Sequence, residues 1–184
     1  MKLLAISGSL RAGSYNTALA RAARDLAPDG VEVELYDDLG ALPPFDADTD
    51  GVDEPVAVAD LRRRIAAADM VLFVTPEYNG SVPGVLKNAV DWASRPHREA
   101  ALAGKTVAVA GATPGQYGAM WAQQDLRRVL GIAGARVIAG EVAVPRAHEA
   151  FDAEGRLSST VIAERLRDHL EALVEHALPT VLAA

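Results

Sequence analysis

Residues 6–17 read Ile6-Ser7-Gly8-Ser9-Leu10-Arg11-Ala12-Gly13-Ser14-Tyr15-Asn16-Thr17, and the rest of the chain is organised around them. An apolar run at residues 3–6 leads into this stretch, and apolar residues at spacings near 3.6 follow it. The pattern predicts a strand, a tight turn and then a helix. Gly8 and Gly13 allow the backbone of such a turn to fold sharply and to lie close to a ligand.

The polar side chains of this turn predict an anion site. The hydroxyl groups and the first N–H groups of the helix would point at one spot. The start of the helix carries a partial positive charge there, and Arg11 adds a full positive charge. The predicted occupant is a phosphate group. The alternative is an ordinary helix cap, in which Ser14 or Asn16 closes the helix. A cap needs one such residue, whereas this turn holds six polar side chains and a cation, which favours the phosphate.

Composition limits the possible functions. The 184 residues are 50% hydrophobic and 23% charged, which predicts one globular domain over residues 1–184. A net charge of −7 argues against a nucleic-acid partner. The chain has no cysteine, and its four histidines lack metal-ligand spacing, so we expect no metal site. We see no signal peptide and no run of membrane-spanning length, so we expect a cytoplasmic protein.

Strand-like apolar runs alternate with helical patterns along the chain. Strands are expected near residues 2–7, 31–36, 70–74, 106–110 and 135–138, and helices near 16–26, 58–68, 83–92, 119–130 and 161–177. The alternation predicts an open parallel sheet with helices on both faces. His169 and His176 of the last helix are expected in solvent.

Two stretches of this pattern have several interpretations. Residues 37–55 are too long for a simple connector, and they could form a lid, an interface arm or a surface segment. Residues 140–145 could extend the fifth strand or form a separate addition that reaches a neighbour.

Three polar loops that contain glycine follow the first, third and fourth expected strands, at residues 7–17, 75–81 and 111–118. Because the carboxyl ends of parallel strands share one edge, we expect the loops to converge on a ligand there. The nucleoside triphosphatase and Rossmann dinucleotide fingerprints are both missing from the first loop. A phosphate on the first loop, with space for a flat ring between the other two, suits flavin mononucleotide (FMN).

Residues of the second and third loops each allow two interpretations. Tyr78 could stack beside a planar ring or lie at an interface, and Asn79 and the backbone amides could bind a ring edge. Glu77 could act as a general base, although a solvated turn residue or a subunit contact is favoured. Thr113 and the three glycines that follow the fourth strand suit a backbone that passes beside a ligand, or a flexible surface turn.

Two motifs carry a resemblance to a known family. They are Gly8-Ser9-Leu10-Arg11-x-Gly13-Ser14-x-Asn16 and Pro76-Glu77-Tyr78-Asn79-Gly80-Ser81-x-Pro83-Gly84-x-Leu86-Lys87-Asn88-Ala89-x-Asp91-Trp92. In order and spacing the chain resembles the NAD(P)H-dependent FMN reductases, which include flavodoxin-like quinone, azo-dye and chromate reductases. The resemblance implies one FMN-binding domain with a flavodoxin-like three-layer α/β/α sandwich and a five-stranded parallel sheet in the order 2-1-3-4-5.

The resemblance also implies site residues and an assembly. Those implied for the FMN phosphate are Ser9, Arg11, Ser14, Tyr15, Asn16 and Thr17. Those implied for the isoalloxazine ring are Pro76, Glu77, Tyr78, Asn79 and Gly80, and Thr113 stands where the family often has serine. A homodimer or homotetramer is implied as well. The chain departs from the family at residues 119–121, Ala-Met-Trp, where many relatives have a Gly-Gly-x-Arg pattern.

We therefore interpret the chain as a flavin oxidoreductase. NADH or NADPH would reduce the bound FMN, and a quinone, a flavin or another small oxidant would then take the electrons in a ping-pong cycle. The flavin carries the chemistry, so no side chain is assigned a catalytic role. The main alternative is a flavodoxin-type electron carrier, which Arg11 disfavours because such carriers usually lack an arginine in the phosphate loop. A non-catalytic regulator that retains the fold is a third possibility.

Overall fold

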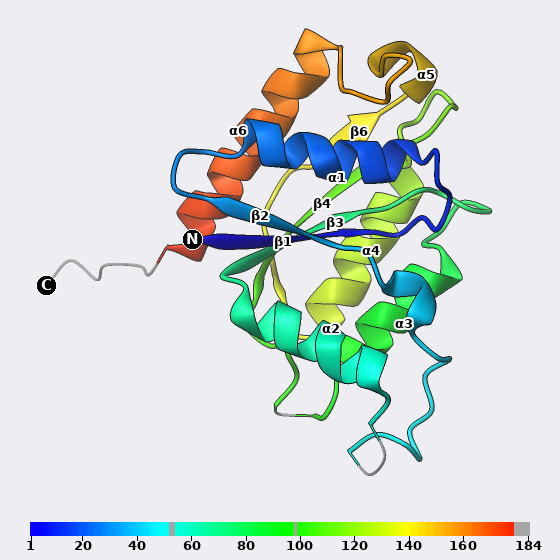
Figure 1. Ribbon diagram of the computed structural model, residues 1–184, viewed down its shortest axis with the longest axis vertical. Helices are drawn as coiled ribbons and strands as arrows, with labels where there is room; N and C mark the ends of the chain where they lie inside the picture. Colours follow the sequence, from blue (N-terminus) through cyan, green and yellow to red (C-terminus); the bar gives the residue numbers. More distant parts are fainter. Residues whose placement is uncertain (52–53, 98, 179–184) are drawn as a thin grey trace, which may run out of the picture.

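The computed structural model, which describes residues 1–51, 54–97 and 99–178, is built on a parallel sheet (Figure 1). Its strand order is β2-β1-β3-β4-β5, and a sixth strand also pairs with β4. The strands are β1 (Lys2–Ser7), β2 (Glu32–Tyr36), β3 (Met70–Val74), β4 (Thr106–Ala112), β5 (Arg136–Val137) and β6 (Val142–Val144). The flavodoxin-like order that the resemblance implied is confirmed.

Helices cover both faces of the sheet (Figure 1). Helices α1 (Tyr15–Leu26) and α6 (Thr160–Ala177) lie on one face, and α2 (Val56–Ala67), α3 (Gly84–Ala93) and α4 (Met120–Ile132) lie on the other. Two shorter segments are η1 (Leu39–Ala41) and α5 (Ala147–Ala150). The arrangement forms the three layers that the sequence pattern predicts.

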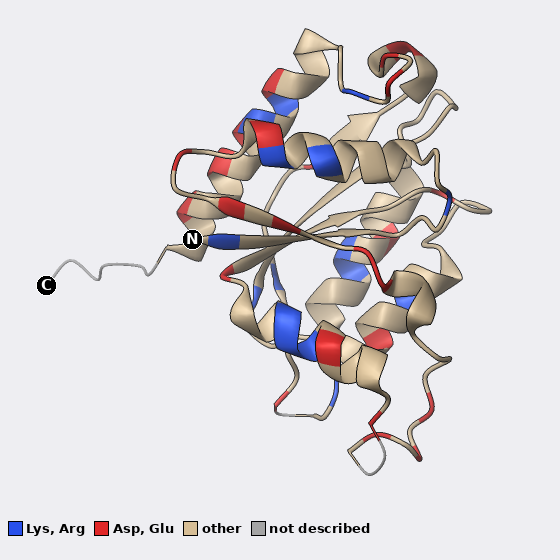
Figure 2. Cartoon of the chain, in the orientation of Figure 1, with Lys and Arg blue, Asp and Glu red and all other residues tan. Residues whose placement is uncertain are grey.

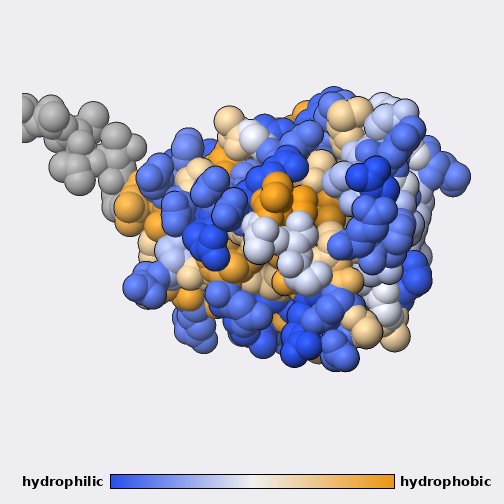
Figure 3. All heavy atoms as spheres, turned by 90° about the horizontal axis from the view of Figure 1, so that it is seen from above, coloured by the Kyte–Doolittle hydropathy of each residue, from blue (hydrophilic) through white to orange (hydrophobic). Residues whose placement is uncertain are grey.

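Alternate side chains of the strands pack into two separate hydrophobic cores, one on each face of the sheet. In β1, Leu3 packs with α1 and α6, whereas Leu4 packs with α2 and α3. All five residues of β3 are buried, as expected for a central strand covered on both faces. Charged residues lie on the outer sides of the helices, on β2 and in the loops (Figure 2). Seen from above, hydrophilic residues surround a smaller group of hydrophobic ones (Figure 3). No helix in the described ranges is long and apolar enough to cross a bilayer.

The fifth strand position differs from the prediction. Strand β5 pairs with the start of β4, through Thr106 and Val107, and β6 pairs with its end, at Ala110 to Ala112. Between β5 and β6 the chain bends away from β4, and Gly140 in this bend has a φ of +81°. The sheet therefore has six strands and not the five that were predicted, because two short strands, β5 and β6, share the edge beside β4. Residues 142–144 extend the edge along β4, which was one of the two alternatives.

His169 is buried on α6, so the expectation that it lies in solvent is wrong. Its ring lies 3.8 Å from the position that a Cβ atom would take at Gly140, beside the interruption between β5 and β6. Burial lowers the pKa of this imidazole. The helical periodicity placed His169 on α6 but did not reveal that the interrupted edge strand covers it.

The long segment after β2 is tied to α3. The carbonyl oxygen of Pro43 accepts hydrogen bonds from Asn88 Nδ2 and Trp92 Nε1, both at 2.8 Å. The N–H of Phe45 donates to Asn88 Oδ1 at 2.7 Å, and the Phe45 ring meets the Trp92 ring edge-on at 4.9 Å between centroids. These contacts fix residues 43–45 to the protein surface, so this part of the segment is not a detached lid.

Candidate functional site

The turn between β1 and α1 is capped and still presents free donors. Ser14 is the N-cap residue, and its Oγ accepts from the N–H groups of Asn16 at 3.2 Å and Thr17 at 3.3 Å. The N–H groups of Ala12, Gly13 and Tyr15 donate to no protein group in the described part of the chain. The predicted cap is therefore present at Ser14, and the same helix start remains open to an anion.

Arg11 is exposed beside these donors. Its guanidinium forms no ion pair or hydrogen bond with any residue that the structure describes. Its N–H donates to Ser9 Oγ at 3.4 Å, which places the Ser9 hydroxyl inside the same turn. Free N–H groups, a hydroxyl and an unpaired cation together match the donor set that a phosphate needs.

Asn16 connects two loops through hydrogen bonds. Its Nδ2 donates to the carbonyl of Ala112, and its Oδ1 accepts from the N–H of Ala112, both at 2.9 Å. The side chain is buried and both ends of its amide are occupied. A phosphate contact by this side chain would break the pair with Ala112. Asn16 thus holds the end of β4 against the start of α1.

The remaining two implied phosphate residues also have partners. Thr17 Oγ1 lies 2.9 Å from Ser7 Oγ, so these hydroxyl groups bond to each other. The Tyr15 ring packs against Phe151 at 5.6 Å between centroids. Of the six residues implied for the phosphate, Ser9, Arg11 and Tyr15 have side chains that donate to no described protein group, and Tyr15 also offers its N–H.

The second loop forms a tight hairpin. Tyr78 and Ser81 exchange two backbone hydrogen bonds of 3.1 and 3.2 Å. Asn79 and Gly80 between them have φ values of +54° and +73°, as the two central residues of a type I′ turn require. The N–H groups of Asn79 and Gly80 donate to no described protein atom, and 49% of Tyr78 is exposed. The hairpin therefore presents an aromatic ring and two free donors.

Glu77 caps a helix that belongs to another loop. Its Oε2 accepts from the N–H groups of Trp121 at 3.0 Å and Ala122 at 3.2 Å, in the first turn of α4. The residue before α4, Ala119, has a φ of +61° and provides no side-chain cap. Glu77 thus caps α4 through one carboxylate oxygen, while its side chain stays partly exposed. The sequence alone did not reveal this role.

A second hydrogen bond joins the hairpin to α4. Ser81 Oγ donates to Asp125 Oδ2 at 2.7 Å. This bond and the nearby Arg128 guanidinium hold the pKa of Asp125 below its usual value. The hairpin and the first two turns of α4 therefore form one connected unit.

The third loop is fixed by its neighbours. Thr113 donates its N–H to the carbonyl of Val144 at 3.1 Å, and its own carbonyl accepts from Ala147 at 3.0 Å. Gly118 has a φ of +59°, and a Cβ there would lie 2.8 Å from Ala143 Cβ. These contacts argue against a flexible surface turn. The loop leads into an exposed aromatic pair, Tyr117 and Trp121, whose ring centroids are 4.8 Å apart.

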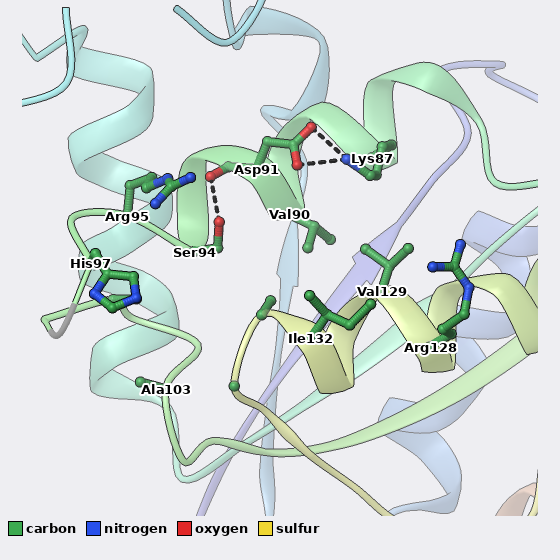
Figure 4. A pocket seen from close by; sticks show the side chains of 13 residues that line it. Lys87, Val90, Asp91, Ser94, Arg95, His97, Ala103, Arg128, Val129 and Ile132 are labelled. Carbon is green, nitrogen blue, oxygen red and sulfur yellow. Dashed lines mark hydrogen bonds and ion pairs between the residues drawn. The ribbon is translucent and has the colours of Figure 1, made fainter. Parts of the chain in front are cut away.

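Cavities lie along the first loop. One of about 430 Å³ lies between the first loop and the hairpin and is lined by Gly8, Leu10, Arg11, Tyr78, Pro83, Gly84 and Val85. Another of about 430 Å³ lies on the β2 side of the loop and shares Leu10 and Arg11 with the first. A third cavity, of about 600 Å³, lies between α3 and α4, with none of the implied flavin contacts among its lining residues (Figure 4). The first two are within the size range of small-molecule sites.

The fold and the site together define a class of protein. A parallel sheet of this order, with an anion-binding turn after β1 and two further loops at the same edge, is a flavodoxin-like, mononucleotide-binding α/β protein. The sequence profile of the NADPH-dependent FMN reductases matches residues 1–149, and the chain belongs to that family. The family predicted from the two motifs is thereby confirmed.

Individual relatives agree with this assignment. The chain is 44% identical to an NAD(P)H-dependent FMN reductase of Pseudomonas aeruginosa over 174 residues, which cover 94% of this chain and 93% of that protein. It is 37% identical to a quinone reductase of Pseudomonas putida over 171 residues, which cover 92% and 89%. The solved structure of FerB, a flavoenzyme NAD(P)H:(acceptor) oxidoreductase from Paracoccus denitrificans, superposes with a TM-score of 0.86 at 36% identity and covers 96% of both chains.

Proposed function

We propose that this chain binds FMN at the loops after β1, β3 and β4, oxidises NADH or NADPH, and reduces a quinone. The observation that carries the proposal is the open start of α1, where unpaired N–H groups and Arg11 lie at the same sheet edge as the Tyr78 hairpin. Family membership supports the flavin and the nicotinamide. The quinone is suggested by the Pseudomonas putida relative, which is a quinone reductase.

The residues of this chain would bind and orient the cofactor. When bound, FMN accepts a hydride from NAD(P)H and passes two electrons to an acceptor. Arg11, Ser9 and the free N–H groups at the start of α1 would hold the phosphate. The free N–H groups of Asn79 and Gly80 would bind the polar edge of the ring, and Tyr78 would flank it.

Glu77 and Asn16 would position the three loops relative to one another. Glu77 joins the hairpin to α4, and Asn16 joins the end of β4 to α1. A ring held between loops that are joined in this way would keep a fixed orientation relative to the donor and the acceptor. Pre-organised contacts of this kind raise the rate of electron transfer to and from the ring, because the ring and its reaction partner then meet in the right geometry.

The test is turnover by the FMN-loaded protein. We expect oxidation of NADH or NADPH, followed at 340 nm, that depends on added 1,4-benzoquinone, with parallel lines in the double-reciprocal plots of a ping-pong cycle. Absence of turnover with both nicotinamides would contradict the reductase and favour a flavodoxin-type carrier. Failure of the colourless protein to take up FMN would contradict both.

We also propose that the chain forms a homodimer, or a homotetramer built from such dimers, through the groove between α3 and α4. In Figure 4, Val90 on α3 points toward Val129 and Ile132 on α4, and the Lys87–Asp91 ion pair lies at the rim. Ile132 is 77% exposed. A second copy would cover this apolar floor. Light scattering should give twice or four times the chain mass for the parent and a smaller mass for Ile132→Glu. A single-chain mass for the parent would contradict the proposal.

A cytoplasmic location is also part of the proposal. The reaction consumes NADH or NADPH, which cells regenerate in that compartment. Fractionation of the source cells, with the protein detected by antibody, should place it in the cytoplasmic fraction. Recovery with secreted or periplasmic proteins would contradict this.

A further inference from the structure

The cavity on the β2 side of the first loop shares Ser9, Arg11 and Thr17 with the residues implied for the FMN phosphate, and it also contains Arg21 and Asp37, which the FMN assignment does not use. Its walls come from the first loop, from α1, and from the residues that follow β2. The polar residues that line it are Ser7, Ser9, Arg11, Thr17, Arg21, Tyr36, Asp37 and Asp38. Because Leu10 and Arg11 also line the groove beside Tyr78, the two cavities meet at the same two side chains.

Opposite charges remain unpaired inside this cavity. Among the described residues, neither Arg11 nor Arg21 has an ion-pair partner within 4.0 Å, and neither does Asp37. The neighbouring Asp38 differs, since its carboxylate lies 3.8 Å from the Arg64 guanidinium. Because Arg11 would hold the FMN phosphate, Arg21 and Asp37 are the charges left for a second ligand. A ligand with an anionic part and hydroxyl donors would satisfy both of them.

We infer that the cavity binds the adenosine half of NAD(P)H, with Asp37 accepting hydrogen bonds from the ribose hydroxyls and Arg11 placed between the two halves of the dinucleotide. The inference rests on the proposed reductase function, because the nicotinamide half would lie in the adjoining groove beside Tyr78. In Rossmann folds, whose glycine fingerprint this chain lacks, a carboxylate in a comparable place hydrogen-bonds the ribose hydroxyl of NAD, which shows that the chemistry is suitable. Arg21 supplies positive charge for the dinucleotide phosphates, next to Arg11, which would hold the FMN phosphate.

Asp37 then becomes a residue that affects the choice of nicotinamide. A carboxylate accepts from the free 2′-hydroxyl of NADH and repels the 2′-phosphate of NADPH. Substitution of Asp37 by serine should therefore reduce turnover with NADH more than turnover with NADPH. A side chain with a purely structural role would affect both donors equally.

The first test compares two donors on the FMN-loaded protein. Reduced nicotinamide mononucleotide carries the reacting ring but lacks the adenosine half. For Asp37→Ala we expect kcat/KM with NADH to fall about tenfold and kcat/KM with the mononucleotide to stay unchanged. Asp29→Ala is the matched control, since Asp29 is an exposed aspartate in the turn before β2 and its removal should change neither value. An equal loss with both donors, or no loss with either, would overturn the inference.

The second test does not depend on turnover. ADP-ribose, titrated into the protein in a calorimeter, should bind to the parent and to Asp29→Ala and about tenfold more weakly to Asp37→Ala, while FMN affinity stays the same in all three. If ADP-ribose binds equally to the parent and Asp37→Ala, the subsite is wrong even when the enzyme is active. If the binding pattern holds without turnover, the reductase proposal fails and the subsite stands.

Discussion

Helices α1 and α4 begin at the same edge of the sheet, yet their first turns are capped in different ways. Ser14, directly before α1, bonds two N–H groups of its own helix. Helix α4 has no such residue, and Glu77, which lies 44 positions before Trp121 in sequence, takes its N–H groups instead. Both helices meet the same physical need, which is to satisfy the donors at a helix start.

The difference separates a ligand site from a structural joint. The start of α1 keeps free N–H groups and the unpaired Arg11, so it can still attract an anion. The start of α4 already holds a carboxylate, which complements the positive end of that helix. An anionic cofactor group is therefore directed to α1, and α4 serves to hold the hairpin in place.

The largest expected effect is at the open helix start. Arg11→Ala should weaken FMN binding by roughly 1.5–3 kcal/mol, the scale of a hydrogen bond to a charged group. Fluorescence titration of FMN measures the change. Stability without FMN should stay the same, since the guanidinium contacts no described protein group. Arg24→Ala, an exposed arginine in the last turn of α1, is the control. Equal FMN affinity in the parent and Arg11→Ala would place the phosphate elsewhere.

The next effect is at the closed helix start, and it concerns stability. Glu77→Ala should lower the free energy of unfolding by about 1–2 kcal/mol, because two N–H groups of α4 lose their acceptor. Urea denaturation of the protein without FMN measures this. Glu77→Gln keeps an acceptor oxygen and should lose less. An unchanged unfolding midpoint in Glu77→Ala would show that water replaces the cap without loss.

The local cap gives a third and smaller effect. Ser14→Ala should lower the free energy of unfolding by about 1 kcal/mol, the usual value for an N-cap serine. The loss is smaller than at Glu77 because Ser14 joins no separate segments. Bound FMN should offset part of it, since phosphate at the same helix start can accept from the released N–H groups. Melting curves with and without FMN test this, and a larger loss than for Glu77→Ala would reverse the ranking of the two caps.

The same contrast explains what the sequence could predict. The β1–α1 turn is contiguous, so its glycines, its cap and Arg11 could be read from spacing alone. The convergence of three loops followed from the parallel topology. The contacts of Glu77 with α4 and of Asn16 with Ala112 join residues 44 or more positions apart, and no local pattern marks them. The Glu77 contact uses backbone N–H groups, so the unusual side chains at residues 120–121 do not reveal it.

The interrupted edge strand was unpredictable for a related reason. The apolar pattern located residues near 135–138, but the departure from β4 at Gly140 depends on packing against α6 and on Arg127, whose Nη1 donates to the Gly140 carbonyl at 2.6 Å. That packing also buries His169. Periodicity indicates which face of a helix is apolar, and it does not indicate where a neighbouring strand bends over that face.

The smallest expected effect is the pH dependence of the second bond between hairpin and α4. The hydrogen bond from Ser81 lowers the pKa of Asp125 in the folded state. The bond therefore stabilises the fold fully above the usual carboxyl pKa of about 3.9. This stabilisation is lost as the pH falls through the lowered pKa of the folded protein. Ser81→Ala should therefore be less stable than the parent at pH 7, and the two should converge in acid. Asp125 is partly exposed, so solvent screening keeps the difference small. Urea midpoints at pH 7 and pH 3 measure it. A constant difference across that range would mean that Ser81 acts through packing and not through the carboxylate.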